Sequence, residues 1–310
     1  MMKENEIAIA HKKKKHGRFN LGQIILGTIL GIYTLFCLLP ILLVFIVAFS
    51  STDSINTKGF SYFPSELSLE GFEYVFRYGR QLLVSYGVTI FITIAGTFLG
   101  LFFMSLFAYA ISRKDFRMRK FFTIFMIIPM LFSGGQMANY IIFTQVYHLK
   151  DSLLLLILPL SITTMNVIIL RTYVATSVPE ELMDSARIDG AGEYRTFFQI
   201  VLPLMKPALA AVGFMMATAY WNDWQNALLY IESESKTPLQ LLLVRIQKSI
   251  EFLLNSKDIS SSALAAMQGN IPQYSCIMAT VIMVVGPILV VYPFFQKYFI
   301  KGLTVGSVKG

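Results

Sequence analysis

Residues 179–207 read PEELMDSARIDGAGEYRTFFQIVLPLMKP, a charged segment with apolar runs on both sides. The flanking runs are about 20 residues or longer, which is the length an α-helix needs to cross a hydrocarbon core roughly 30 Å thick. A segment this polar has to leave the hydrocarbon. The sequence therefore indicates an all-α, polytopic membrane protein in which residues 179–207 form an element at the membrane surface.

The composition supports this class. Hydrophobic residues make up 55% of the 310 residues and charged residues 14%, which is more apolar than a globular domain. The net charge of +8 sits beside apolar runs, so it indicates membrane orientation rather than nucleic-acid binding. Cys37 and Cys276 lie inside apolar runs without metal-ligand spacing, so we expect packing residues and no metal site. His11, His16 and His148 are isolated and offer no catalytic pair.

Six apolar runs predict six transmembrane helices, at about residues 22–49, 84–111, 121–147, 152–175, 208–231 and 275–299. The first run is too long for a signal-peptide core and predicts an uncleaved anchor. Pro129 and Pro159 interrupt the third and fourth runs, as membrane helices tolerate. The pair Gly134-Gly135 fits either a kink or close helix packing, and packing is the preferred interpretation.

Six crossings place both termini on one side of the membrane. Of the 26 Lys and Arg residues, 18 lie on that side, so the positive-inside rule predicts cytoplasmic termini. We therefore expect a basic cytoplasmic tail at residues 1–20, a membrane domain at 21–300 with a cytoplasmic segment at 177–207, and a cytoplasmic tail at 301–310. The predicted location is the plasma membrane of a bacterium.

Two outward loops are long. Residues 50–83 contain a Ser68-led pattern of apolar and aromatic residues that predicts a short surface helix. Residues 232–274 are polar and rich in Ser and Gln. Both fit solvated connectors, although loops of this length without a role are uncommon.

The cytoplasmic segment carries its own helix signals. Ser177 and Glu180 fit a capping box, and Pro179 suits a first turn. Gly190 predicts the end of the helix, because glycine readily takes the left-handed conformation that closes helices. The resulting helix is about 12 residues, or roughly 18 Å, which is too short to cross the bilayer.

Leu182, Ala186 and Asp189 fall on one side of this helix, and Ala186 would allow another surface to approach closely. Glu181 and Arg187 would remain available as charged contacts. From the residues alone, a docking helix and a plain amphipathic link between two spans both fit.

A family resemblance favours docking. Residues 180–191, EELMDSARIDGA, and 198–208, FQIVLPLMKPA, resemble the EAA loop of ABC importer permeases in its carbohydrate-importer form. Residues 63–72 (FPSELSLEGF), 132–135 (FSGG), 221–224 (WNDW) and 301–310 (KGLTVGSVKG) are similar to the maltose-permease-like family, especially its Gram-positive oligosaccharide and complex-sugar branch. One position departs: the family's leading alanine is Glu181 here.

The resemblance implies the type I ABC importer permease fold, with the helix in a cleft of a cytoplasmic ATPase subunit. We call residues 177–207 the coupling segment. Its implied coupling residues are Glu180, Glu181, Leu182, Ser185, Ala186, Arg187, Asp189, Gly190 and Ala191. The implied partners are a second related permease, two ATP-binding subunits that hold ATP and Mg, an extracytoplasmic solute-binding protein and a sugar.

Two further sets of residues are candidates. Around Asp223, aromatic and polar residues fit either an interfacial aromatic belt that includes Tyr230 or the lining of a sugar path. The path candidates are Trp221, Asn222, Asp223, Trp224 and Gln225. By resemblance, Gln268, Gly269 and Asn270 are candidates for contact with the binding protein, although a flexible connector fits as well.

No Gly-x-x-x-x-Gly-Lys-Ser/Thr motif occurs, so we expect no ATP hydrolysis, no catalytic residue and no cofactor in this chain. The main alternative is an ion-coupled secondary transporter, which would normally show charged coupling sites near mid-membrane and internal repeats. Neither is evident in the sequence. A membrane receptor or scaffold is the third choice.

Overall fold

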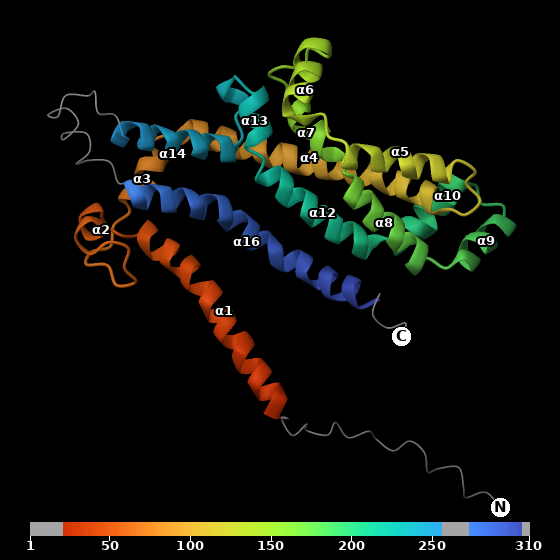
Figure 1. Ribbon diagram of the computed structural model, residues 1–310, viewed down its shortest axis with the longest axis horizontal. Helices are drawn as coiled ribbons and strands as arrows, with labels where there is room; N and C mark the ends of the chain where they lie inside the picture. The colour runs from red at the N-terminus through yellow and green to blue at the C-terminus, as the bar shows by residue number, and fades with distance from the viewer. Residues whose placement is uncertain (1–20, 256–272, 306–310) are drawn as a thin grey trace, which may run out of the picture.

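The computed structural model describes residues 21–255 and 273–305, and within these ranges it is built from helices and one isolated bridge between Ser50 and Leu67 (Figure 1). The helices are α1 Leu21–Ala48, α2 Thr52–Lys58, α3 Glu70–Phe76, α4 Gly79–Ser112, α5 Arg119–Leu131, α6 Gly135–Ile141, η1 Ile142–Val146, α7 Leu154–Ser161, α8 Thr164–Ser177, α9 Glu180–Ile188, α10 Glu193–Thr196, η2 Phe197–Val201, α11 Leu202–Leu204, α12 Lys206–Trp221, α13 Gln225–Tyr230, η3 Glu234–Lys236, α14 Leu239–Asn255 and α16 Gln273–Val305. The predicted all-α class is confirmed.

Three helices, α1, α4 and α16, are long and apolar enough to cross a membrane. Three bent units bring the possible number of spans to 6: α5 with α6–η1 at 110°, α7 with α8 at 47°, and α10–α11 with α12 at 76°. The expected N-terminal tail at 1–20 lies outside the described residues, as do residues 306–310 of the tail expected at 301–310. Residues 301–305 are not a separate tail, because they continue α16.

The glycine pair forms a turn. Gly135 has a φ of +78° and is the first residue of α6, and no heavy atom would lie within 4 Å of an added Cβ. At Gly134 an added Cβ would meet only the Cβ of Ala138, at 3.4 Å. Among the described residues, the pair therefore supplies backbone freedom for the bend rather than close contact between helices.

The fifth run is interrupted as well. α12 ends at Trp221, and α13 begins at Gln225. Asp223 caps the second helix, since its carboxylate accepts the backbone N–H of Asn226 at 3.1 Å. Neither proline nor glycine marks this break in the sequence. The side-chain cap therefore accounts for a restart that the apolar pattern alone did not predict.

The core is centred on α4. An added Cβ at Gly96 would lie 2.3 Å from the ring of Tyr220 in α12, and one at Gly100 would lie 2.4 Å from the carbonyl oxygen of Ser161 in α7. These two glycines are one turn apart, so α4 presents a small-residue face to two neighbours. The Tyr220 hydroxyl crosses this contact and donates to the Ile157 carbonyl at 2.6 Å.

The two outward loops contain packed helices. The Ser68-led helix is confirmed as α3, but it is not simply a surface helix: an added Cβ at Gly71 would lie 2.5 Å from the Ser275 carbonyl carbon of α16. In α14, Leu243 and Ile246 are buried in a cluster with Val75 of α3. A connector alone therefore does not describe either loop.

Figure 1 shows the long axis of the molecule, with α9 and α10 at one end and α2, α3 and α14 toward the other. α1 leans away from the remaining helices and meets α16 near its own C-terminal end (Figure 1). Among the residues of α1, Val47 and Ala48 are buried. Residues 21–42 of this apolar helix are exposed.

Candidate functional site

The sequence predicted the end of α9 correctly but misassigned the cap at its start. Ser177 is the last residue of α8, and α9 follows with Pro179 as its N-cap and no side-chain cap bond. The predicted capping box is therefore wrong, because the preceding helix uses the serine. Glu180 and Glu181 lie in the first turn, where acidic side chains complement the helix dipole.

The predicted end at Gly190 is confirmed. Gly190 has a φ of +77°, and its N–H donates to the Arg187 carbonyl at 3.1 Å. The Ala191 N–H donates to the Ala186 carbonyl at 2.9 Å. Together these two bonds form a Schellman motif, which closes the helix and fixes the direction in which the chain leaves it.

One face of α9 packs on its own chain. Met183 and Ala186 are buried, so the prediction that Ala186 admits a partner is wrong: its face is already covered within this chain. Two apolar residues of the helix are open to solvent. Ile188, on the opposite side, is 86% exposed, and Leu182, at the edge of the packed face one turn before Ala186, is 44% exposed. Tyr194, just after the turn, is 80% exposed. Apolar side chains this exposed on a charged helix indicate a contact surface.

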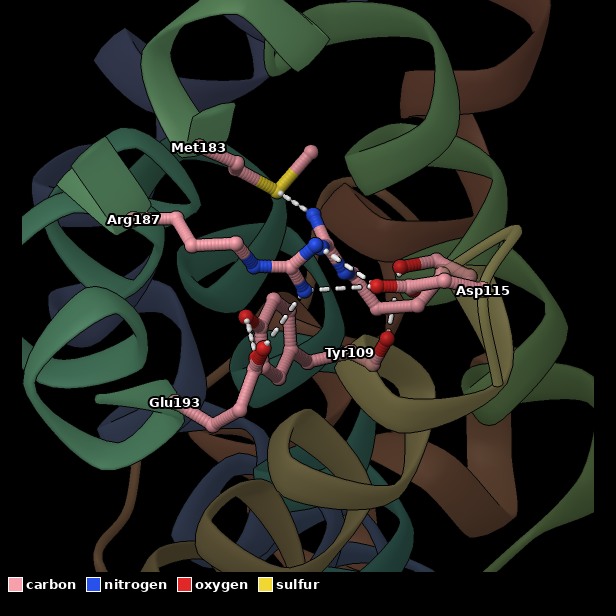
Figure 2. A network of polar contacts seen from close by, with 7 residues as sticks. Tyr109, Asp115, Met183, Arg187 and Glu193 are labelled. Carbon is pink, nitrogen blue, oxygen red and sulfur yellow. Dashed lines mark hydrogen bonds and ion pairs between the residues drawn. The ribbon is translucent and has the colours of Figure 1, made fainter. Parts of the chain in front are cut away.

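An ionic cluster holds the packed face (Figure 2). The Arg187 guanidinium contacts the Asp115 carboxylate at 2.7 Å and the Glu193 carboxylate at 3.2 Å. The Asp115 carboxylate is also 3.0 Å from Arg113. Arg187 is thus engaged within the chain, but 56% of its side chain is exposed, and its availability as a charged contact for a partner stays a prediction. The cluster ties α9 to the loop between α4 and α5 and to α10.

Three more contacts reinforce the same link. The Tyr109 hydroxyl of α4 donates to Glu193 at 2.6 Å, and Arg113 donates to the Met183 sulfur at 3.0 Å (Figure 2). Lys114 pairs with Glu180 at 3.0 Å. Because most of these charges are half exposed, each pair contributes about 0–1 kcal/mol, and the cluster acts through its number of contacts rather than through any single one.

The Arg187 guanidinium is the main cause that holds the pKa of Asp115 below its usual range, with a further hydrogen bond from Arg113. The Asp115 pairing also raises the pKa of Arg187. Asp115 is therefore ionised at neutral pH and serves as the common acceptor for both guanidinium groups. Sequence analysis missed it, although it is the single acid in the basic stretch 113–120.

The remaining predicted coupling residues occupy different sides of the helix. Ser185 donates its hydroxyl to the Glu181 carbonyl one turn earlier, at 2.7 Å. Glu181 and Asp189 are exposed. Ile188 and Tyr194 could not be predicted as contact residues from the sequence, because each is an isolated apolar residue near the Gly190 turn and belongs to no repeating apolar pattern.

The proposed path residues gather at the break between α12 and α13. The Trp221 indole N–H donates to the Val284 carbonyl of α16 at 3.0 Å, and the Asn222 amide donates to the Thr218 carbonyl at 2.9 Å. Asp223 is used as the cap, whereas Gln225 is exposed. Tyr230 is buried and stacks on Tyr140 with ring centroids 6.0 Å apart, so the belt interpretation is wrong for that residue.

Trp224 is half-buried at the same break. The binding-protein candidates Gln268, Gly269 and Asn270 lie outside the described residues. Their role stays a prediction.

A bundle of helical spans with a short charged helix at one end fits a membrane transport permease. The chain belongs to the family of binding-protein-dependent transport system inner membrane components, which its residues 96–305 match. It is thus a multi-pass membrane protein of a transport family rather than an enzyme.

Two relatives from Bacillus subtilis illustrate the likeness. The polygalacturonan/rhamnogalacturonan transport system permease protein YtcP is 36% identical over 90% of this chain and 94% of its own. Protein LplC is 35% identical over 98% and 99%. Among solved structures, a bacterial ABC transporter involved in the import of the acidic polysaccharide alginate matches with a TM-score of 0.76 and 26% identity, covering 92% of this chain and 99% of that one.

Proposed function

We propose that this permease subunit moves a sugar or oligosaccharide into a bacterial cell, driven by ATP hydrolysis on separate subunits that dock on α9. The relatives support the cargo: YtcP is named for polygalacturonan and rhamnogalacturonan, and the solved relative for alginate. The helical spans support a membrane pathway. ATP and Mg would be held by the docking subunits, because this sequence carries no P-loop.

The observation that carries the proposal is the two-sided construction of α9. Its exposed surface presents Ile188, with Leu182 at the edge of the packed face, and these apolar side chains fit an apolar cleft on a partner. Its other side is held to α4, the α4–α5 loop and α10 by the cluster around Arg187 and Asp115. A partner that displaces the exposed side therefore displaces the membrane helices with it.

The complete importer would contain a second, related permease, a pair of cytoplasmic ATPase subunits and an extracytoplasmic solute-binding protein. Closure of the ATPase pair would move α9, and the movement would pass through α10 and α11 into α12. The path residues from Trp221 to Gln225 remain candidates for the sugar route, and Asn222 and Gln225 are the exposed ones among them.

Uptake in sealed vesicles tests the proposal. The chain is reconstituted with its companion permease, ATPase pair and binding protein, and uptake of labelled oligosaccharide is measured with ATP inside the vesicles. We expect uptake that needs both ATP and the binding protein. Uptake driven by a proton or sodium gradient without ATP would contradict the proposal and favour an ion-coupled secondary transporter.

The docking surface is tested in the same complex. Ile188→Ser removes an apolar side chain that is 86% exposed, so we expect co-purification of the ATPase pair to fall about tenfold or more. Phe63→Ser is the matched control, because Phe63 is 83% exposed but lies in the loop at the other end of the molecule. Equal loss in both variants, or in neither, contradicts docking on α9.

A further inference from the structure

α16 contains a proline at a position where three spans meet. Pro287 has no N–H, so the carbonyl of Met283, four residues earlier, loses its helical donor. An unpaired carbonyl is costly in hydrocarbon. Here the Tyr86 hydroxyl donates to the Met283 carbonyl at 3.0 Å. The Trp221 indole N–H donates to the next carbonyl, that of Val284, also at 3.0 Å.

The two donors come from two different helices. Tyr86 belongs to α4 and Trp221 to the end of α12, and their ring centroids lie 6.5 Å apart. Both side chains pack on the cluster that buries Leu82 and Ile246. α16 is therefore fixed to α4 and α12 at one level of the membrane, by directional bonds to its own backbone.

Beyond this level the same three helices separate. They line an open apolar cavity of about 600 Å³ that extends from Pro287 toward the C-terminal part of α16. Thr93 and Thr97 of α4 and Gly213 of α12 line it. Further along, α16 meets α12 through ring contacts of Phe214, at 5.7 and 5.4 Å, and the first of these is with Tyr292. Breaking these ring contacts leaves no backbone polar group unpaired, so this part of the contact can rearrange more readily than the hydrogen bonds at Pro287.

α12 connects this arrangement to the coupling segment. Its Lys206 end follows α10 and α11 after a bend of 76°, and its other end carries Trp221. A displacement of the coupling segment thus reaches the part of α12 that borders the cavity, whereas the Trp221 end is held on α16.

We propose that Tyr86 and Trp221 are positioning residues that fix α16 at Pro287 as a pivot, and that the C-terminal half of α16 moves relative to α12 into the cavity during transport. This inference rests on the proposed function, because ATPase closure supplies the displacement.

Distances between spin labels test the pivot in the reconstituted importer. Met215 and Val290 are exposed residues of α12 and α16 on the cavity side of the pivot, and Asn222 and Val281 lie close to it. Between the nucleotide-free and the ATP-vanadate-trapped complex, we expect the first pair to shift by roughly 5 Å, about one helical pitch, and the second to stay constant. Equal shifts in both pairs, or no shift in either, overturn the pivot.

A double-mutant cycle supplies a second readout. Tyr86→Phe leaves the Met283 carbonyl unpaired, so we expect ATP-driven uptake to fall about tenfold while binding-protein-stimulated ATPase activity changes less than twofold. Pro287→Ala restores a backbone donor to that carbonyl, so adding Tyr86→Phe to it should change uptake less than twofold. Tyr33→Phe in α1, where Tyr33 is 67% exposed, is the matched control and should behave as wild type.

If Tyr86→Phe lowers uptake as much in the Pro287→Ala background as in wild type, the pivot is overturned. The proposed function still stands in that case, provided that wild-type uptake needs ATP. Loss of uptake and ATPase activity together in Tyr86→Phe also overturns it, because that pattern marks general damage. If wild-type uptake does not need ATP, the proposed function itself fails and the pivot with it.

Discussion

At the scale of single residues, Gly100 decides how closely α4 can approach α7. A Cβ at this position would lie 2.4 Å from a backbone oxygen, that of Ser161, which cannot rotate away. We expect Gly100→Ala to lower the free energy of unfolding by about 1–3 kcal/mol, the usual cost of overpacking. Thermal unfolding of the purified protein in detergent measures it.

Gly87→Ala is the matched control, since Gly87 lies in the same helix and an added Cβ would meet nothing within 4 Å. There we expect no loss, or a gain of up to about 1 kcal/mol, because alanine is the better helix former. Similar losses at both glycines would contradict the packing role of Gly100.

Asp115 predicts a pH dependence. Its folded-state pKa lies below the unfolded value of about 3.9, so the carboxylate stabilises the fold above that value and the contribution is lost as the pH falls through the folded-state pKa. We expect hydrogen exchange of α9 amides, corrected for intrinsic rates, to be unchanged from pH 8 to 5 and to accelerate below pH 4.

In Asp115→Asn we expect exchange in α9 at pH 7 to be faster than in wild type by at most about fivefold, because a half-exposed pair contributes no more than about 1 kcal/mol. The acceleration below pH 4 should also diminish. An unchanged acid response in this variant would show that another carboxylate controls α9.

At the scale of elements, the Schellman turn sets the direction of the chain after α9. Gly190→Ala places an L-residue at a φ of +77°, which costs about 1–2 kcal/mol, and should weaken ATPase association by up to about 30-fold. Gly190→Pro also removes the N–H that bonds Arg187 and should abolish association. Co-purification of the ATPase pair measures both.

Gly192→Ala serves as the control, because Gly192 has a φ of −70° and open space around it. Normal association of the Gly190→Pro variant would contradict the proposed role of this turn.

The ends of helices were predictable where the cause is local. Gly190 closes α9 through its own backbone conformation, so one residue type was enough. The sequence also placed the start of α9 near Pro179, but the predicted Ser177 cap is wrong, because α8 extends through Ser177. The ionic cluster was also out of reach, since Asp115 and Arg187 are 72 positions apart and only the packing of α9 beside α4 brings them together.

At the scale of the whole molecule, the charge distribution predicts which end faces the cytoplasm. With Cys37 and Cys276 replaced by Ser, a single cysteine at Tyr194 should react with a membrane-impermeant maleimide only in inverted vesicles. A cysteine at Phe63, 83% exposed at the other end, should react only in intact cells. Labelling of both from one side would contradict the predicted topology.

The close contact of Gly71 with Ser275 also constrains biosynthesis. The two residues are roughly 200 positions apart, so at about 5–20 residues per second the ribosome needs about 10–40 s between them. Throughout that interval α3 has left the ribosome without its partner helix. The outer surface of the first third of the chain thus matures only when the last helix emerges, so truncation before α16 leaves a nascent chain that exposes this surface to chaperones and proteases.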